Sequence, residues 1–267
     1  MTRTRTGLTL LGIAAAVLAT APAAAVPPGP QHHQHGPCAR SDALFCEDFE
    51  SQPVGGAASL DWGIDTRHGT LQVERDRRAG KVLRVHTEGN GTAFLRVDDF
   101  AAPGNSFWGR LRLKVDDFPT APDWAHFTLV EVTGSGSPEV VRPLGGQFAP
   151  TVGPDATFWG VGADGGPTGD WTSWRESAPT VEDRWQCVEI EWSAADNRVA
   201  VWFDGVAQPD LTVTTSEHGG APVDFVLPDP DTIKVGWQLY QGGPTPDHFD
   251  LWVDDITFDT ERVGCGR

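Results

Sequence analysis

The stretch WQCVEIEWSAADNRVAVWFDG, residues 185–205, decides the fold class. Two runs within it alternate apolar and polar side chains with a period of two, as a β-strand with one buried face does. The apolar positions are Val188, Ile190 and Trp192 in the first run and Val199, Val201 and Phe203 in the second. Because only SAADN separates the runs and DG closes the second, we predict an antiparallel hairpin here.

The rest of the chain continues this pattern. Its 31 glycines and 21 prolines punctuate short runs rich in valine, phenylalanine and tryptophan, and no stretch sustains a helical apolar period. We predict further strands at residues 44–49, 82–87, 107–115, 126–132, 232–239 and 249–258. Regular short strands with turn signals between them are typical of an antiparallel two-sheet sandwich, so we predict an all-β fold.

The first 25 residues indicate export. Arg3 and Arg5 precede a short apolar run, and Ala23, Ala24 and Ala25 offer small residues for a signal peptidase. The apolar run is shorter than the roughly 20 residues that a membrane span needs. We therefore expect a signal peptide at residues 1–25, a proline- and histidine-rich linker at 26–37 and a single secreted domain at 38–267.

The chain is strongly acidic. Loss of the two arginines of the leader would change its formal charge from -17 to -19. This charge argues against nucleic acid or an anionic membrane as a partner. We expect a monomer that acts on other molecules outside the cell.

Four cysteines remain after such processing, and an even number in an oxidising compartment indicates disulfide bonds. Three pairings are possible. We favour Cys38 with Cys46, which lie eight residues apart, and Cys187 with Cys265, which both lie late in the chain. No C-x-x-C spacing supports the alternative of a zinc site.

Several polar side chains that could bind a ligand or take part in catalysis lie opposite the predicted core. In VGWQLYQGG, alternation places Gln238 and the only tyrosine, Tyr240, on the outward face. In AHFTLVEV it places His126 outward, and in VVRPLGGQF the residues Arg142 and Gln147 flank a Gly-Gly pair where we expect a β-bulge. Each residue also has an ordinary structural interpretation, as a surface or strand-forming side chain.

The glycine-rich and acidic segment WGVGADGGPTGDWTSW predicts a loop over one edge of the sheet. Trp171 and Trp174 within it could stack on the faces of sugar rings, although aromatic residues of a sandwich more often belong to the core.

The order of the motifs HFTLVEV, RPLGGQ, WQCVEIEW, VGWQLYQGG and WVDDITFDTERVGC resembles the secreted cellulose-induced protein family of fungi and actinobacteria. The resemblance extends from CEDFES near the start to the terminal ERVGC. It implies a concanavalin A-like β-jelly roll, similar to polysaccharide lyases, in which one concave sheet face binds a polysaccharide.

The resemblance also implies roles for individual residues. The matching positions are His126, Arg142, Gln147 and Tyr240 as the catalytic set and Glu189 as a contact to the substrate. Arg142 and Gln147 have one additional residue between them compared with the family. The family pattern can carry a histidine two residues before the arginine, where this chain has Val140.

Two further features follow from the resemblance. It implies a structural calcium ion bound by Glu50 and Asp254 with a backbone oxygen near residues 80–81, oxygen being the ligand that calcium selects. A plain acidic surface is the alternative. It also implies the disulfide bond between Cys187 and Cys265.

The catalytic set suits β-elimination from a uronate. Arg142 and Gln147 would stabilise the charge that develops beside the carboxylate. Since a phenol ionises near pH 10, Tyr240 is the better acid and His126 the better base. A non-catalytic carbohydrate-binding protein is the second hypothesis, favoured by the acidic charge and by Val140.

A glycoside hydrolase is the third hypothesis, because Glu189 and Glu191 would lie roughly 7 Å apart on one strand face. It ranks last, since only Glu189 matches the family.

Overall fold

The computed structural model describes residues 38, 42–56, 61–137, 140–165, 178–214, 216–221, 223–239, 241 and 248–266, all within one compact unit, Gln34–Arg267. Within these ranges the regular elements are β1 (Phe45–Glu47), β2 (Gly63–Asp76), β3 (Gly80–Val97), the 3-10 turn η2 (Pro103–Asn105), β4 (Phe107–Val115), β5 (His126–Ser135), β6 (Val140–Phe148), β7 (Thr157–Asp164), β8 (Gln186–Ser193), β9 (Arg198–Phe203), β10 (Val206–Thr214), β11 (Asp229–Leu239) and β12 (His248–Asp259). No helix among the described residues is long and apolar enough to cross a membrane.

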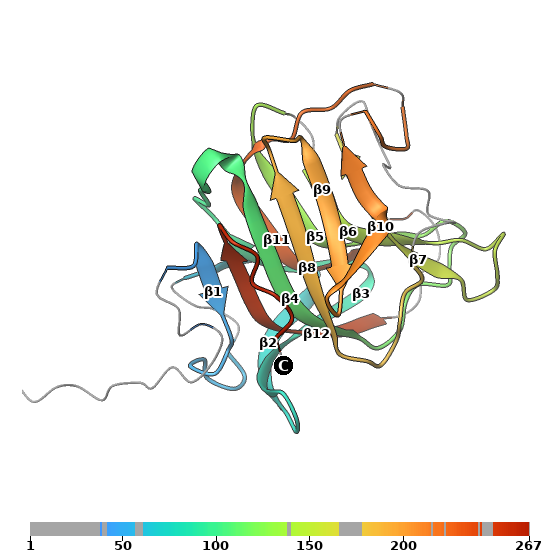
Figure 1. Ribbon diagram of the computed structural model, residues 1–267. Helices are drawn as coiled ribbons and strands as arrows, with labels where there is room; N and C mark the ends of the chain where they lie inside the picture. The colour runs from blue at the N-terminus through green and yellow to red at the C-terminus, as the bar shows by residue number, and fades with distance from the viewer. Residues whose placement is uncertain are drawn as a thin grey trace, which may run out of the picture. The chain divides into compact units, whose positions relative to one another are not determined.

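The strands form a continuous antiparallel sheet in the order β10-β9-β8-β4-β12-β3-β11-β5-β6-β7, with β1 added to β12 and β2 added to β3 (Figure 1). The sheet folds over on itself, so that β6 and β7 lie against β9 and β10 across the core. Its two halves thereby become the two layers of a sandwich. This arrangement confirms the predicted all-β jelly roll.

The long strand β3 connects the two layers. Residues 83–88 pair with β12, whereas residues 92–97 pair with β11. Between them the chain bends at Gly89 and Gly91. Gly89 has a φ of 52°, and a Cβ atom on Gly91 would lie 2.4 Å from the carbonyl oxygen of His68, so that only glycine fits there.

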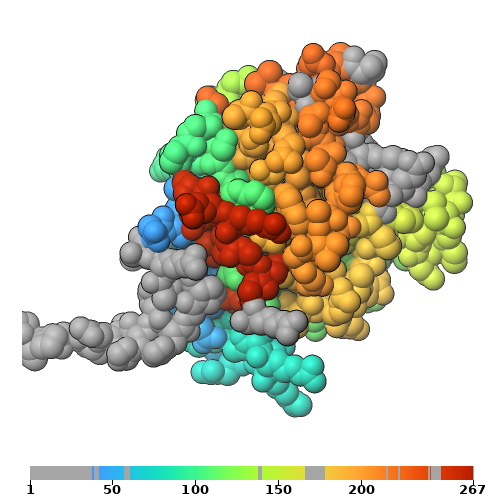
Figure 2. All heavy atoms as spheres, in the orientation of Figure 1, coloured from blue at the N-terminus to red at the C-terminus, as the bar shows by residue number. Residues whose placement is uncertain are grey.

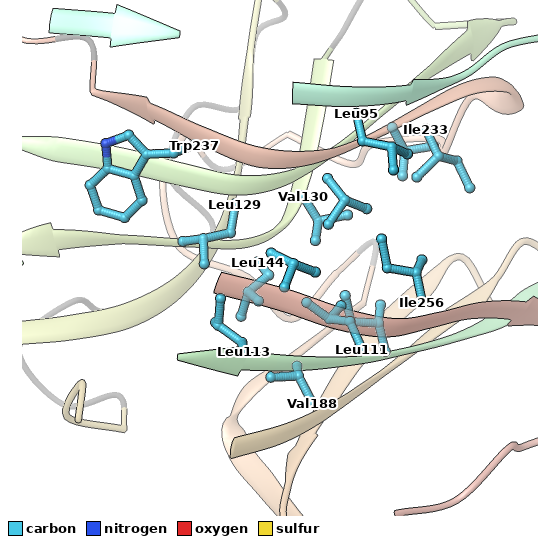
Figure 3. Close-up of a cluster of buried hydrophobic side chains, with 14 of the residues drawn as sticks. Leu95, Leu111, Leu113, Leu129, Val130, Leu144, Val188, Ile233, Trp237 and Ile256 are labelled. Carbon is cyan, nitrogen blue, oxygen red and sulfur yellow. The ribbon is translucent and has the colours of Figure 1, made fainter. Parts of the chain in front are cut away.

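The core lies between the layers. All six apolar positions predicted for the β8–β9 hairpin are buried there. Figure 3 shows side chains of the two layers facing each other, with Leu95 and Ile233 on one side and Leu111, Val188 and Ile256 on the other. Burial of such side chains is the main favourable contribution to folding, at about 25 cal/mol per Å² of apolar surface.

Two disulfide bonds join Cys38 to Cys46 and Cys187 to Cys265, which confirms the favoured pairing. The first closes a short segment beside β1, and the second fastens the C-terminal residues to β8. There is no free cysteine in the described part of the chain. Disulfide bonds are consistent with the expected extracellular location.

Candidate functional site

His126 and Gln147 lie directly opposite each other at the start of β5 and near the end of β6. The Gln147 amide donates a hydrogen bond to His126 Nε2 at 2.9 Å and lies 3.4 Å from the carbonyl oxygen of Trp124. His126 Nδ1 lies 3.2 Å from Gln241 Oε1. A neutral imidazole with its proton on Nδ1 satisfies both contacts, which leaves the lone pair of Nε2 directed at the amide.

Gln241 is held in turn by Asn90, which lies at the bend of β3. The Asn90 amide donates to the Gln241 carbonyl oxygen at 2.6 Å, and the Gln241 backbone N–H donates to Asn90 Oδ1 at 3.1 Å. The bend that joins the two layers therefore also fixes the partner of the imidazole. Sequence reasoning missed Asn90, although its position between two glycines within a strand marks a special backbone site.

A β-bulge brings Arg142 to the same face as Gln147. Arg142 pairs with Gly162 of β7, and Gly145 pairs with Gly160. Between these two pairs β6 therefore advances by three residues while β7 advances by two. In a regular strand two residues five apart would point to opposite faces; the additional residue of the bulge turns both to one face. The expected bulge is thus present, directly before the Gly-Gly pair.

The Arg142 side chain is only 3% exposed, although it lies on the face opposite the core. Its Nη2 lies 3.4 Å from the carbonyl oxygen of Ala163 and 3.4 Å from Asp164 Oδ1. Close packing of β5 and β6 also requires the glycines, since a Cβ atom on Gly145 would lie 2.7 Å from the carbonyl oxygen of Phe127. A guanidinium group buried among polar neighbours is typical of binding sites for oxygen-rich ligands.

Three further charged residues lie on this face and were missed by sequence reasoning. Lys234 Nζ of β11 lies 2.8 Å from Asp65 Oδ2 of β2 and 3.3 Å from Glu131 Oε2 of β5. Burial raises the pKa of Glu131 despite the charge of Lys234. Burial alone would lower the pKa of Lys234, but the hydrogen bond to Asp65 and the charges of both carboxylates outweigh it, and that pKa is raised.

Gln238 lies on β11 opposite Thr128 of β5 and is half-buried, as the alternation predicts. The predicted residues Tyr240, Trp171 and Trp174 lie outside the described residues.

Glu189 lies in the other layer, on β8, and is not close in the sheet to His126. Its carboxylate accepts hydrogen bonds from Arg262 Nε at 3.0 Å, from Arg262 Nη2 at 2.8 Å and from the backbone N–H of Gly264 at 3.0 Å. Glu191, the other carboxylate of that strand face, forms an ion pair with Arg198. The Glu189 carboxylate therefore anchors the C-terminal residues, and its contact with a substrate stays a prediction.

Glu50 and Asp254 lie near the meeting point of β1, the β2–β3 turn and β12. Burial and the charge of Asp255 raise the pKa of Asp254 to about 7. Glu50 Oε1 accepts a hydrogen bond from the Lys81 backbone N–H at 2.9 Å, and a Cβ atom on Gly80 would lie 2.1 Å from that oxygen. Within the described ranges no group of three His, Cys, Asp or Glu side chains is arranged to hold a metal ion.

The charges of Asp255 and Asp48 act on Asp254, and carboxylates that repel one another gain from a cation such as calcium, whose coordination backbone oxygens can complete. The ammonium group of Lys81 already contacts two such oxygens, at 2.6 Å from Glu50 O and 2.7 Å from Gln52 O.

No family model and no curated protein matches this chain in sequence. Among solved structures, the chain is similar to "Cellulose induced protein, Cip1", with a TM-score of 0.60 and 19% identity over 83% of this chain and 100% of the other. The chain has the fold of Cip1. A second similar structure, described among endo-acting O-glycanases that initiate mucin breakdown, has a TM-score of 0.54 and 10% identity over 83% of this chain and 100% of the other. Identities this low establish the fold and not the activity.

Proposed function

We propose that this chain is a secreted carbohydrate-active protein that binds a polysaccharide on the outward face of β5, β6 and β11 and cleaves it by β-elimination. The observation that carries the proposal is that His126, Gln147 and Arg142 lie on one face, which requires both the pairing of β5 with β6 and the bulge in β6. The likeness to Cip1 and to a described O-glycanase supports a saccharide as the ligand.

In this proposal the acidic proton at C5 of a uronate residue passes to His126 Nε2, whose lone pair faces the Gln147 amide in the free protein. The C4–O bond breaks, a double bond forms between C4 and C5, and the leaving oxygen takes a proton from Tyr240. Arg142 and the released Gln147 amide stabilise the negative charge that grows on the carboxylate. Gln238, Trp171 and Trp174 contact neighbouring sugar residues.

Non-catalytic binding of a neutral polysaccharide is the second candidate, and a specific observation favours it. The two cations described above on this face are paired with carboxylates, Arg142 with Asp164 and Lys234 with Asp65 and Glu131. Such pairing reduces the positive electrostatic potential that would attract a polyuronate to this face. The net negative charge of the whole chain also disfavours a polyanion.

The deciding experiment incubates the mature protein with polyglucuronate, alginate and cellulose. Elimination produces unsaturated uronate, followed by ultraviolet absorbance, whereas binding alone retains the protein on the insoluble polymer without a product. For a lyase, His126→Ala and Tyr240→Phe should each lower the rate by about 10²–10⁴-fold, the usual contribution of general acid–base catalysis. Arg96→Ala, at an exposed ion pair with Asp98, is the matched control and should leave the rate unchanged.

Unsaturated product formed at the native rate by the His126 and Tyr240 variants would contradict the catalytic assignment. Retention on the polymer with no product from the native chain would establish the binding alternative instead.

We also propose that calcium binds at Glu50 and Asp254 with a structural role. A ligand that binds only the folded state stabilises it by about 2.7 kcal/mol at a hundredfold excess over its Kd. Thermal unfolding in calcium and in EDTA measures this effect, which Asp254→Asn should abolish. Equal midpoints in both buffers would instead indicate that the Lys81 ammonium supplies the positive charge at this position.

A further inference from the structure

The outward face of β4, in the layer opposite the His126 face, combines cations with tryptophan rings. The Arg112 guanidinium lies 5.5 Å from the ring centre of Trp185, and Lys114 Nζ lies 4.0 Å from that of Trp252. On the same layer Arg262 lies over Trp202 at 4.7 Å. Aromatic rings are thus held at this surface instead of in the core.

A cavity of about 510 Å³ opens on this face beside the disulfide-bonded C-terminal residues. The residues that line it include Arg110, Arg112, Trp185, Asp204 and Asp255. Figure 2 shows this face of the molecule, with β12 and the C-terminal residues in red beside β8 and β9 in orange. The volume lies within the range of roughly 300–1,000 Å³ that small-molecule sites occupy.

Arg110 is a buried cation in the wall of this cavity, with 7% of its surface exposed. Within the described part of the chain its guanidinium makes one long hydrogen bond, from Nη2 to Thr257 Oγ1 at 3.4 Å, and its Nε makes none. Buried donors without acceptors each destabilise a protein by about 1–3 kcal/mol. A ligand that brings oxygen atoms into the cavity would supply the missing acceptors.

The mixture of groups in the lining indicates the class of ligand. Arg110 and Arg112 offer only donors, and Asp204 and Asp255 offer only acceptors. An anion would need donors alone and a metal ion would need acceptors alone. A hydroxyl group both donates and accepts, so a polyhydroxylated neutral molecule matches the whole set.

The charges agree with a neutral ligand. Asp255 Oδ2 lies 4.0 Å from Arg112 Nη1, and Asp204 accepts hydrogen bonds from Arg184 Nη2 at 3.2 Å and the Cys187 N–H at 3.0 Å. The lining thus holds two carboxylates beside its two guanidinium groups, with Asp204 paired to Arg184 outside the lining, in a chain whose net charge disfavours anions.

We propose that this cavity is a second saccharide site, which binds one or two neutral pyranose residues with a sugar face against Trp185 and sugar hydroxyls on Arg110, Arg112 and Asp204. The site is separate from the His126 face and does not depend on its function. It would let the protein hold a polysaccharide chain at a point distant from the first site.

The test uses the mature, disulfide-bonded chain labelled with ¹⁵N, in which the indole N–H signal of Trp185 is assigned from its loss in Trp185→Phe. Cellobiose and xylobiose are the neutral probes, and digalacturonate is the anionic probe. We expect the neutral disaccharides to shift the Trp185 signal with saturation and digalacturonate to leave it unchanged. His126→Ala should not alter these shifts, which separates this proposal from the function proposed for the other face.

Calorimetric titration of the same disaccharides gives the strength of binding. Trp185→Ala should weaken it by about two- to tenfold, the contribution of one aromatic contact. If Trp185→Ala fails to fold, Arg112→Gln replaces it as the test. Because the Arg112 side chain is 40% exposed, this variant should fold and should weaken binding of the disaccharides. The absence of any Trp185 shift with both neutral disaccharides means that the cavity holds water only, and a shift with digalacturonate alone means an anion site; either result overturns the proposal.

Discussion

Glu189 and Glu131 are both buried glutamates on the outward faces of the sandwich, but their surroundings differ. Glu189, 1% exposed, accepts two hydrogen bonds from Arg262 and one from the Gly264 backbone. Glu131, 8% exposed, shares the single ammonium group of Lys234 with Asp65, and burial raises its pKa.

This difference in hydrogen-bond partners indicates that Glu189 is an anchoring residue, whereas Glu131 is available to a ligand. Three donors occupy most of the acceptor positions of one carboxylate, so Glu189 fixes the C-terminal residues and has little capacity left for a ligand. A carboxylate whose burial outweighs its ionic partner is typical of functional faces. Glu131 lies on the face that carries His126 and Arg142, as that interpretation requires.

The largest effect is expected from removal of the disulfide bond beside Glu189. Cys187→Ala with Cys265→Ala opens a loop of 78 residues and should lower the free energy of unfolding by about 4.5 kcal/mol. Cys38→Ala with Cys46→Ala, whose loop spans 8 residues, is the matched control and should lower it by about 2.5 kcal/mol. Urea denaturation followed by tryptophan fluorescence measures both; equal losses would show that the long loop adds nothing to the anchoring.

A smaller effect is expected from the ion pair itself. Arg262→Ala leaves the buried Glu189 carboxylate with only the Gly264 N–H and should lower the free energy of unfolding by about 3 kcal/mol. Glu189→Gln should lower it by about 1–2 kcal/mol, because Arg262 is 42% exposed and water can solvate it.

Arg96→Ala, which removes an exposed ion pair, is the control for the loss of a surface arginine and should cost less than about 1 kcal/mol. If Arg262→Ala cost no more than this control, Glu189 would not be an anchor.

The sequence predicts the fold wherever the pattern is local. The β8–β9 hairpin and the core faces of β5 and β11 follow from alternation within a few residues. The alternation does not predict β2, because half of its residues are exposed and its buried apolar positions begin only at Leu71. It also predicts only residues 82–87 of β3, because the glycines of the bend interrupt the pattern.

The candidate site is less predictable because its contacts join distant segments. The resemblance placed His126, Arg142 and Gln147 together, and the structure shows them on one face. The ion pair of Lys234 with Asp65 spans 169 residues, and neither position carries a local signal. Such pairs depend on strand order and register, which one sequence does not determine.

The smallest effect concerns Glu131, and it depends on pH. The pKa of Glu131 is raised above its ordinary value of 4.5, so the folded chain keeps this proton at pH values where the unfolded chain has lost it. This group therefore destabilises the native chain progressively as pH rises from about 4.5 through the pKa of the folded state. Glu131→Gln removes the titrating carboxyl group. Lys234 keeps its ion pair with Asp65, and the charges of Arg142 and Asp164 still act on position 131.

The unfolding free energy of Glu131→Gln, minus that of the native chain, should increase with pH across this window. Urea denaturation at a series of pH values measures the difference, with Glu217→Gln, at an exposed glutamate, as the control for the loss of a carboxylate. A difference that stays constant with pH would mean that Lys234 satisfies Glu131 fully. The two buried glutamates would then both be structural, and the His126 face would lose its candidate ligand-binding carboxylate.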